Sequence, residues 1–354
     1  MRKVAFLVVG AVMLAGCKAP GPPQGPPGGA AKPDLAEASQ FQALPAVMEA
    51  ASHPRTPEKV ALGRMLYYDT RFSSEGTISC YVCHPLHDYG QDHRVKGVGV
   101  GHQQGDRNDP TVFNAAGQLA QFWDGRAADV ETQAMGPPLN PIEMGMKDGA
   151  AIVAVIRSIP GYQEAFRQAF PAETDPVTFE NFGRAIGAFE RGLTTPAPFD
   201  RYLGGEPGAL NAREKDGLRT FVSVGCATCH TGTYVGGSMY RKAGMFQPWP
   251  NQGDPGRFNV TKLAADRMVF KVPSLRNVEQ TWPYFHDGSV ERLDDAIRMM
   301  ARYQLGKELT DTQVTLIRGF LASLTGEIDR PYIDEPVLPP SPGNRAGSAP
   351  LAER

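Results

Sequence analysis

The pentapeptides CYVCH, at residues 80–84, and CATCH, at residues 226–230, decide the fold of this chain. In each of them a histidine follows the second of two cysteines, the Cys-x-x-Cys-His pattern that attaches haem c. The two cysteines can reach the two vinyl groups of one porphyrin, and the histidine can bind the iron from the proximal side. The chain is therefore predicted to hold two covalent haem c groups, the first through Cys80, Cys83 and His84 and the second through Cys226, Cys229 and His230.

Paired cysteines also occur in zinc sites and in redox sites. Two Cys-x-x-Cys pairs can supply four thiolates to one zinc ion, but a zinc site leaves the histidine after each pair unexplained. A thioredoxin-like redox pair requires a βαβ setting, and neither pair has one. Covalent haem is the interpretation that uses every fixed residue of both motifs.

The first residues have the composition of an export signal. Arg2 and Lys3 precede a short apolar run from Val4 to Leu14, and the sequence Leu-Ala-Gly-Cys ends at Cys17. A charged start, a short apolar core and small residues describe a secretory signal, and the ending resembles a bacterial lipobox. We therefore expect residues 1–16 to be a lipoprotein signal peptide and Cys17 to be lipidated. The alternatives are a plain signal peptide and a membrane anchor, although the run is shorter than the ~20 residues of a membrane span.

These features predict the cellular location. Haem c is attached outside the cytoplasm of bacteria, which agrees with an exported protein. Lys18 stands after the modified cysteine, where an aspartate often retains lipoproteins in the inner membrane. We expect a periplasmic protein that is anchored by lipid to the outer membrane.

Two segments rich in proline, glycine and small residues enclose the rest of the chain. We interpret residues 17–40 as the lipidated cysteine and a tether, and residues 336–354 as a flexible tail. The stretch between them is long enough for two domains of ordinary size. The boundary between the two domains is expected in the segment from residue 195 to residue 208, which separates a predicted N-terminal haem domain, residues 41–203, from a predicted C-terminal haem domain, residues 204–335.

Between these segments the apolar residues recur with helical periodicity. No run alternates convincingly as a strand, and glycine and proline are frequent, which suits long loops around flat cofactors. The formal net charge is −2 with both signs interspersed, so nothing indicates nucleic-acid binding. The sequence predicts a mainly α fold of two cytochrome c-like domains with long loops, and its expected helices cover residues 56–69, 150–158, 161–170, 179–193, 211–224, 293–303 and 310–324.

Several further segments, in their order along the chain, resemble bacterial dihaem cytochrome c peroxidases. The similarity extends from about residue 55 to residue 325, and it implies a first haem where peroxide reacts and a second haem that passes electrons. The segments that carry it are LGRMLYYD (62–69), GTISC (76–80), RNDPTVFN (107–114), QFWDGRA (121–127), GPPLNPIEM (136–144), FDRYL (199–203), KVPSLRN (271–277) and PYFHDG (283–288).

The resemblance assigns the iron ligands. It implies that His84 and His230 are the proximal ligands of the first and second haem, and that Met300 is the second ligand of the C-terminal haem, with Met299 as the competing candidate. A methionine and histidine pair raises the reduction potential, which suits a haem that stores an electron. A methionine on a helix is otherwise an ordinary core residue.

The same resemblance assigns three residues to catalysis. Glu143 matches the family's catalytic glutamate, which takes a proton from one peroxide oxygen and returns it to the other. Gln133 matches a neighbouring residue that can hydrogen-bond peroxide. Trp123 matches a tryptophan between the haems that shortens the electron's path; the alternative is an ordinary core tryptophan.

His102 is a candidate for a ligand that can leave the iron. In many family members a histidine on this loop binds the peroxidatic iron at rest and is released when the other haem is reduced. The glycine-rich run from Gly97 to Gly101 can allow such movement. His87 and His93 are nearby alternatives for this position.

Asn108, Thr281 and Pro283 match a calcium site between the two domains. Calcium binds oxygen ligands, here an amide side chain, backbone carbonyls and water. With so few carboxylates the site is expected to hold one calcium ion with modest affinity. His53 and the pair Gly183 and Gly187 are interpreted as structural.

The expected function is reduction of hydrogen peroxide to water with electrons from a small cytochrome c or a cupredoxin. The family is often dimeric, so a homodimer is possible. One alternative is an oxidase of partner-protein tryptophan that resembles MauG, but MauG-like chains have tyrosine where this chain has Met300. Another is a dihaem electron carrier with both irons saturated, in which Glu143 and Gln133 would have no role.

Overall fold

The computed structural model describes Met1 and residues 34–341. The predicted signal peptide, the lipidation site at Cys17, most of the tether and residues 342–354 of the tail lie outside the described residues. No helix in residues 34–341 is both long enough and apolar enough to cross a membrane.

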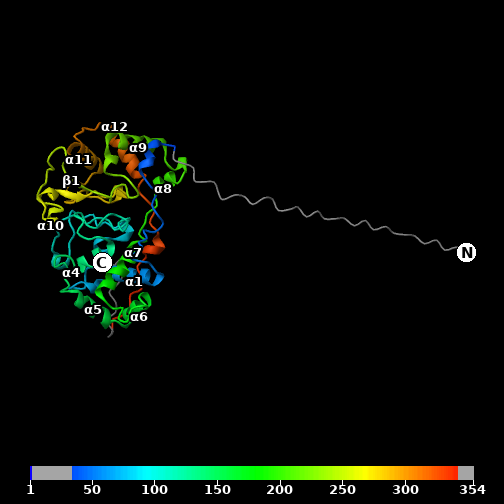
Figure 1. Ribbon diagram of the computed structural model, residues 1–354, viewed down its shortest axis with the longest axis vertical. Coiled ribbons are helices and arrows are strands. Elements are labelled where there is room, and N and C mark those ends of the chain that lie inside the picture. Colours follow the sequence, from blue (N-terminus) through cyan, green and yellow to red (C-terminus); the bar gives the residue numbers. More distant parts are fainter. Residues whose placement is uncertain (2–33, 342–354) are drawn as a thin grey trace.

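The chain forms two lobes, each with its own hydrophobic core (Figure 1). The lower lobe in the view contains the first haem motif and the upper lobe the second. The principal helices of the lower lobe are α1 (Pro57–Tyr68), α5 (Gly149–Ser158), α6 (Pro160–Ala169) and α7 (Phe179–Glu190), and those of the upper lobe are α8 (Pro198–Leu203), α9 (Ala212–Val224), α11 (Leu293–Leu305) and α12 (Asp311–Ala322).

Short elements complete the structure. Much of the chain between the longer helices has no regular structure, as the abundance of glycine and proline indicated. The short helices are α2 (Cys80–Cys83), α3 (Val130–Ala134), α4 (Gly136–Leu139), α10 (Phe258–Thr261) and α13 (Arg330–Ile333).

The longer helices begin at side chains that cap them. The hydroxyl of Thr56 accepts a hydrogen bond from the backbone N–H of Lys59 over 3.2 Å, before α1. Before α9, Asn211 and Glu214 each bond the other's backbone N–H, over 2.8 and 3.0 Å. Such caps satisfy N–H groups that a helix leaves without partners. Each helix predicted from the sequence corresponds to an observed helix, and the mainly α fold is confirmed.

Each core depends on one close helix pair. In the lower lobe α1 packs along α7, and a Cβ atom added to Gly63 would lie 1.9 Å from the carbonyl oxygen of Ala185. In the upper lobe α9 packs along α12, where a Cβ on Gly217 would lie 2.2 Å from the carbonyl oxygen of Leu316. Only glycine permits these approaches, because any side chain would separate the two helices.

The structure contains two short strands that no alternating run in the sequence indicated. The strands β1 (Tyr240–Lys242) and β2 (Val269–Lys271) pair antiparallel, with Tyr240 opposite Lys271. Each strand has three residues, and so short a run cannot show an alternating pattern.

The lobes are not continuous stretches of sequence. Leu35 and Phe41, near the predicted end of the tether, are buried in the upper core beside Phe199 and Tyr202. The backbone N–H of Leu35 donates to the hydroxyl of Tyr202 over 3.1 Å. In Figure 1 this early segment accordingly lies in the upper lobe. Residues 35–41 and 199–202 thus pack on the core that follows the predicted boundary at residue 203.

The end of the described chain returns to the lower lobe. Ile333 of α13 is buried in the lower core, and Ile328 and Tyr332 pack against it. The Tyr332 hydroxyl donates to the carbonyl oxygen of Phe189 over 2.6 Å. The chain therefore crosses between the lobes at both ends, which ties the two cores together.

Candidate active site

The first haem motif is held by the lower core. In α2 the backbone N–H of His84 donates to the carbonyl oxygen of Cys80 over 2.8 Å, so the motif forms one turn of helix. The hydroxyl of Tyr67, on α1, donates to the carbonyl oxygen of His84 over 2.9 Å. His84 Nδ1 lies 3.3 Å from the carbonyl oxygen of Gly90. This contact directs the Nε2 atom of His84 to a ligand, and burial lowers the pKa of His84, which favours the neutral imidazole that binds metals.

The second haem motif follows the end of α9. Gly225 ends the helix with a φ of 109°, a left-handed conformation that favours glycine. The backbone N–H of His230 then donates to the carbonyl oxygen of Cys226 over 3.0 Å. His230 is buried, which lowers its pKa to about 4 and keeps the imidazole neutral.

Two neighbouring cavities lie at the two haem motifs. The first, of about 990 Å³, is lined by Cys80, Cys83 and His84. The second is lined by the cysteines and the histidine of the second motif. Because the cysteine pairs line different cavities, they cannot form one four-thiolate zinc site. Within residues 34–341 the one cluster of His, Cys, Asp or Glu with metal-ligand spacing is His53, Asp129 and Glu131, which contains no cysteine.

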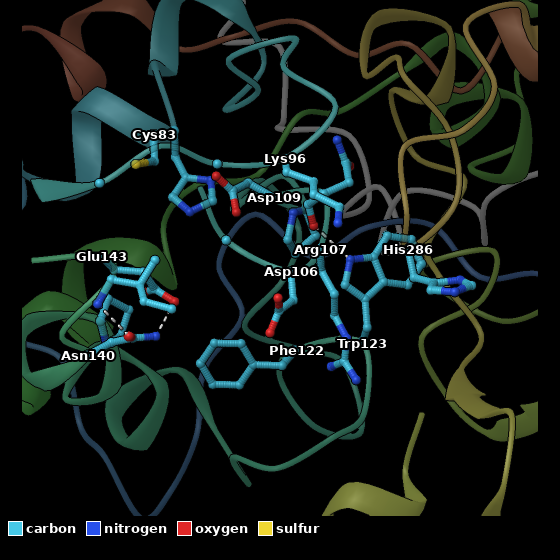
Figure 2. A pocket seen from close by; sticks show the side chains of 18 of the residues that line it. Cys83, Lys96, Asp106, Arg107, Asp109, Phe122, Trp123, Asn140, Glu143 and His286 are labelled. Atoms are coloured by element: carbon cyan, nitrogen blue, oxygen red, sulfur yellow. Dashed lines mark hydrogen bonds between the residues drawn. The ribbon is translucent and has the colours of Figure 1, made fainter. Parts of the chain in front are cut away.

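Glu143 opens onto the first cavity together with His84. The side-chain amide of Asn140 donates to Glu143 Oε1 over 2.7 Å and fixes the carboxyl group (Figure 2). Burial raises the pKa of Glu143, the nearby charge of Asp109 raises it further, and Arg126 and the Asn140 bond oppose the shift. A glutamate with a raised pKa can both accept and donate a proton near neutral pH.

Gln133 also lines the first cavity. It lies on α3, a short helix that begins where Asp129 Oδ1 accepts a hydrogen bond from the backbone N–H of Thr132 over 2.8 Å. The structure thus brings Gln133 and Glu143 to one cavity, as the resemblance implied.

Trp123 lines both cavities. Its indole N–H donates to the carbonyl oxygen of Asn108 over 2.9 Å, and its own carbonyl oxygen accepts the backbone N–H of Lys271 over 2.8 Å. Figure 2 shows Trp123 and His286 on one side of the first cavity and Glu143 on the other. The indole N–H and the backbone of Trp123 are therefore both held where the two cavities meet.

Met300 and Met299 occupy different positions. Both pack near a small apolar cluster that contains Trp249 and Phe270. Met300 lines the second cavity with His230, whereas Met299 is not among its lining residues. This geometry favours Met300 as the residue that reaches the second iron.

His102 lies outside the first cavity. It is exposed at the end of the turn Val100–His102. The turn is held to the segment that contains Glu143, because the backbone N–H of Val100 donates to the carbonyl oxygen of Glu143 over 3.0 Å. The structure does not bring His102 and His84 together, so ligation by His102 requires this loop to move.

The two alternatives to His102 have other partners. His93 stacks on Trp282 at 4.2 Å between ring centroids and lies 3.0 Å from Asp88. His87 lies 3.2 Å from the guanidinium of Arg330, on α13. Neither histidine lines the first cavity.

The proposed calcium residues lie near one another on the second cavity. Asn108, Thr281 and Pro283 all line it. Asn108 is buried, and in this arrangement its side-chain oxygen accepts a hydrogen bond from Gln91 over 3.3 Å. The side-chain amide of Asn108 donates to the carbonyl oxygen of Arg94 over 2.9 Å.

Three charged residues of the site were not predicted from the sequence. Asp109 lines the first cavity, and burial raises its pKa to about 7. Glu190 is buried on the same cavity, and burial raises its pKa to about 8. Lys271 lines the second cavity. Asp109 and Lys271 belong to segments that carry the family resemblance, but the sequence alone does not show which charged side chains lack a partner.

Comparison with known proteins identifies the family. A family model described as di-haem cytochrome c peroxidase matches residues 57–208. The chain is 44% identical to the cytochrome c551 peroxidase of Nitrosomonas europaea over 84% of this chain and 88% of that protein. It is 35% identical to the methylamine utilization protein MauG of Methylorubrum extorquens over 75% of each chain.

A solved structure of a related protein has the same fold. A MauG-like protein associated with microbial copper homeostasis superposes with a TM-score of 0.70 at 28% identity, over 86% of this chain and 98% of that protein. The residues that the family model matches contain the first haem motif, and a di-haem family accounts for two haem c groups. The chain belongs to the family of di-haem cytochrome c peroxidases.

Proposed function

We propose that the protein reduces hydrogen peroxide to water at the first cavity, with electrons that enter at the second. The observation that carries this proposal is the placement of Glu143 and His84 on one cavity while Trp123 lines both. A proton-handling acid beside one haem, joined by an aromatic side chain to a second haem, fits an enzyme better than a simple electron carrier.

Protons are handled by residues of the first cavity. The haem held by His84, when bound, supplies the electrons that break the O–O bond. Glu143 accepts a proton from one peroxide oxygen and donates it to the other, which leaves as water. Gln133 orients the peroxide by a hydrogen bond. The complete reaction consumes two electrons and two protons for each peroxide and yields two waters.

Electrons come from a small redox protein. A small cytochrome c or a cupredoxin is the expected donor, because the second haem takes one electron at a time. The side chain of Met300 suits this role as the second ligand, since a thioether favours ferrous iron. Trp123 shortens the path between the two cavities.

Access to the first iron depends on His102 in this proposal. His102 would hold the iron at rest and would leave it when the second haem is reduced; in the position seen here His102 lies outside the first cavity. Calcium bound by Asn108, Thr281 and Pro283 fixes the two domains relative to each other. The glycine-rich run before His102 supports the movement.

The protein acts in the periplasm. Lipid on Cys17 anchors it to the outer membrane, and residues 17–40 hold the folded part away from the surface. A homodimer is the expected assembly.

Replacement of the catalytic acid tests the function. Glu143→Gln keeps the size and the bond to Asn140 but removes the carboxyl group, so we expect both haem groups to be retained and most peroxide turnover to be lost. Glu164→Gln, on the exposed side of α6, is the matched control and should keep full turnover. Unchanged turnover in Glu143→Gln would refute the assignment.

A MauG-like oxidase remains the competing function within the family, and it is supported by the 28% identity to a MauG-like structure. Met300 on the second cavity argues against it, because MauG-like chains have tyrosine there. Peroxide turnover with a reduced small cytochrome c as the only reductant distinguishes the two functions.

A further inference from the structure

Lys271 is a buried cation. It is the last residue of β2, and 9% of its surface is exposed. Its ammonium group donates to the side-chain oxygen of Gln118. Within residues 34–341 no carboxylate lies within ion-pair distance of it. Burial lowers the pKa of Lys271 to about 8.

Such an ammonium group requires an anion. An isolated charge in an apolar environment is strongly unfavourable, and buried charges in proteins are paired or bound to a ligand. Gln118 supplies only a neutral oxygen. The missing partner must therefore lie in the cavity that Lys271 lines.

The second cavity is arranged for an anionic ligand. Among the residues that the structure describes, its lining contains the cationic residues Arg241, Lys242 and Lys271 and no aspartate or glutamate. The first cavity differs, because Asp109, Glu143 and other carboxylates line it. Haem c carries two propionate groups, which are carboxylates, at the edge of the porphyrin opposite its cysteine attachment.

We propose that Lys271 binds a propionate of the C-terminal haem through its ammonium group. Arg241 and Lys242 are exposed at the border of the same cavity, so water weakens their effect. Lys271 is the buried charge among the three, and its contact is the strong one.

The backbone of Lys271 gives this contact a second consequence. Its N–H group donates to the carbonyl oxygen of Trp123 over 2.8 Å. One residue thus connects the edge of the electron-transfer haem to the tryptophan that lines both cavities. The ammonium charge also stabilises the reduced haem relative to the oxidised haem, because reduction adds a negative charge nearby.

Two substitutions test the contact in the holoprotein. Lys271→Met keeps the length of the side chain and removes the charge, and we expect the reduction potential of the C-terminal haem to shift downwards while that of the N-terminal haem changes little. Lys147→Met removes one exposed lysine charge that lines neither cavity and should leave both potentials unchanged. The potentials are measured by spectroelectrochemical titration with both haems bound.

Lys271→Arg keeps the charge, and it tests the contact independently if Lys271→Met does not fold. If the Lys271 ammonium group contacts a propionate, its replacement by a guanidinium changes the propionate bending frequency in the resonance Raman spectrum. The reduction potential of the C-terminal haem should stay near that of the native protein. An unchanged bending frequency in Lys271→Arg, or an unchanged potential in folded Lys271→Met, overturns the proposal. Neither result depends on peroxide turnover, so the proposal stands or falls separately from the assignment of Glu143.

Discussion

Arg107 and Asp254 form a bidentate ion pair between the two halves of the chain, with nitrogen–oxygen distances of 2.6 and 2.9 Å. The same guanidinium donates to Asp124 over 2.7 Å. Asp124 follows Trp123, and Arg107 precedes Asn108, whose carbonyl oxygen holds the indole N–H. One arginine therefore fixes both segments that position the tryptophan.

Asp254→Asn should weaken this arrangement. The variant lacks the carboxylate that pairs with Arg107, so the Arg107 side chain and Trp123 are held less firmly. Electron transfer between the haems should therefore slow on the order of tenfold. Flash reduction of the C-terminal haem, followed by the arrival of the electron at the N-terminal haem, measures this step.

Asp175→Asn is the matched control for that variant. Asp175 pairs with Arg157 at 2.6 Å on the exposed surface of the lower lobe, and its loss should leave the electron-transfer rate unchanged. Equal rates in the native protein and in Asp254→Asn would show that the Arg107 pair does not position Trp123.

Gly63→Ala should destabilise the lower lobe. The added methyl group would meet the backbone of α7 at Ala185, and overpacking of this kind costs about 1–3 kcal/mol. Thermal unfolding of the holoprotein should therefore begin at a lower temperature. Gly208→Ala is the control, because a Cβ there meets no atom within 4 Å; a melting temperature of Gly63→Ala equal to that of the control would contradict the close approach of α1 and α7.

His102→Ala tests the leaving ligand. If His102 binds the resting iron, the variant has a five-coordinate N-terminal haem in the fully oxidised state and reacts with peroxide without prior reduction. Optical and electron paramagnetic resonance spectra of the oxidised protein show the change. His87→Ala, whose native partner is Arg330, should keep the resting spectrum, and a native spectrum in His102→Ala would exclude this ligand.

Glu190→Gln should flatten the dependence of stability on pH. Burial raises the pKa of Glu190 to about 8 in the folded chain, whereas an unfolded glutamate has a pKa of about 4.3. Between these values the folded state binds the proton more tightly, so its stability falls as pH rises, by up to ~1.4 kcal/mol per pH unit. Glu190→Gln has no titratable group at this position, so its stability does not fall with pH for this reason.

Melting temperatures measured from pH 5 to pH 8 check that expectation. The advantage of Glu190→Gln over the native protein should grow as the pH rises. A constant difference between the two proteins over this range would mean that folding does not raise the pKa of Glu190.

The haem motifs and the helix starts could be predicted from the sequence, because they depend on covalent attachment and on local capping. The spacing of Cys80, Cys83 and His84 is fixed by the cofactor, and Thr56 and Asn211 mark helix starts through hydrogen bonds within one turn. Such features depend on residues that are close together in the chain.

Features that depend on distant partners were not predictable. Leu35 looked like part of a tether because the core that buries it lies far along the chain. Lys271 looked like an ordinary lysine, since only the folded structure shows that no carboxylate of the described part of the chain reaches it. The position of His102 depends on a loop whose contacts with Glu143 are not encoded in local spacing.

The most direct test is spectroscopy of the half-reduced holoprotein with calcium present, followed by addition of hydrogen peroxide. The account predicts that the N-terminal iron, beside Glu143, is five-coordinate and reacts at once, while the C-terminal iron remains six-coordinate and supplies an electron. Two six-coordinate irons that are both inert towards peroxide would contradict it.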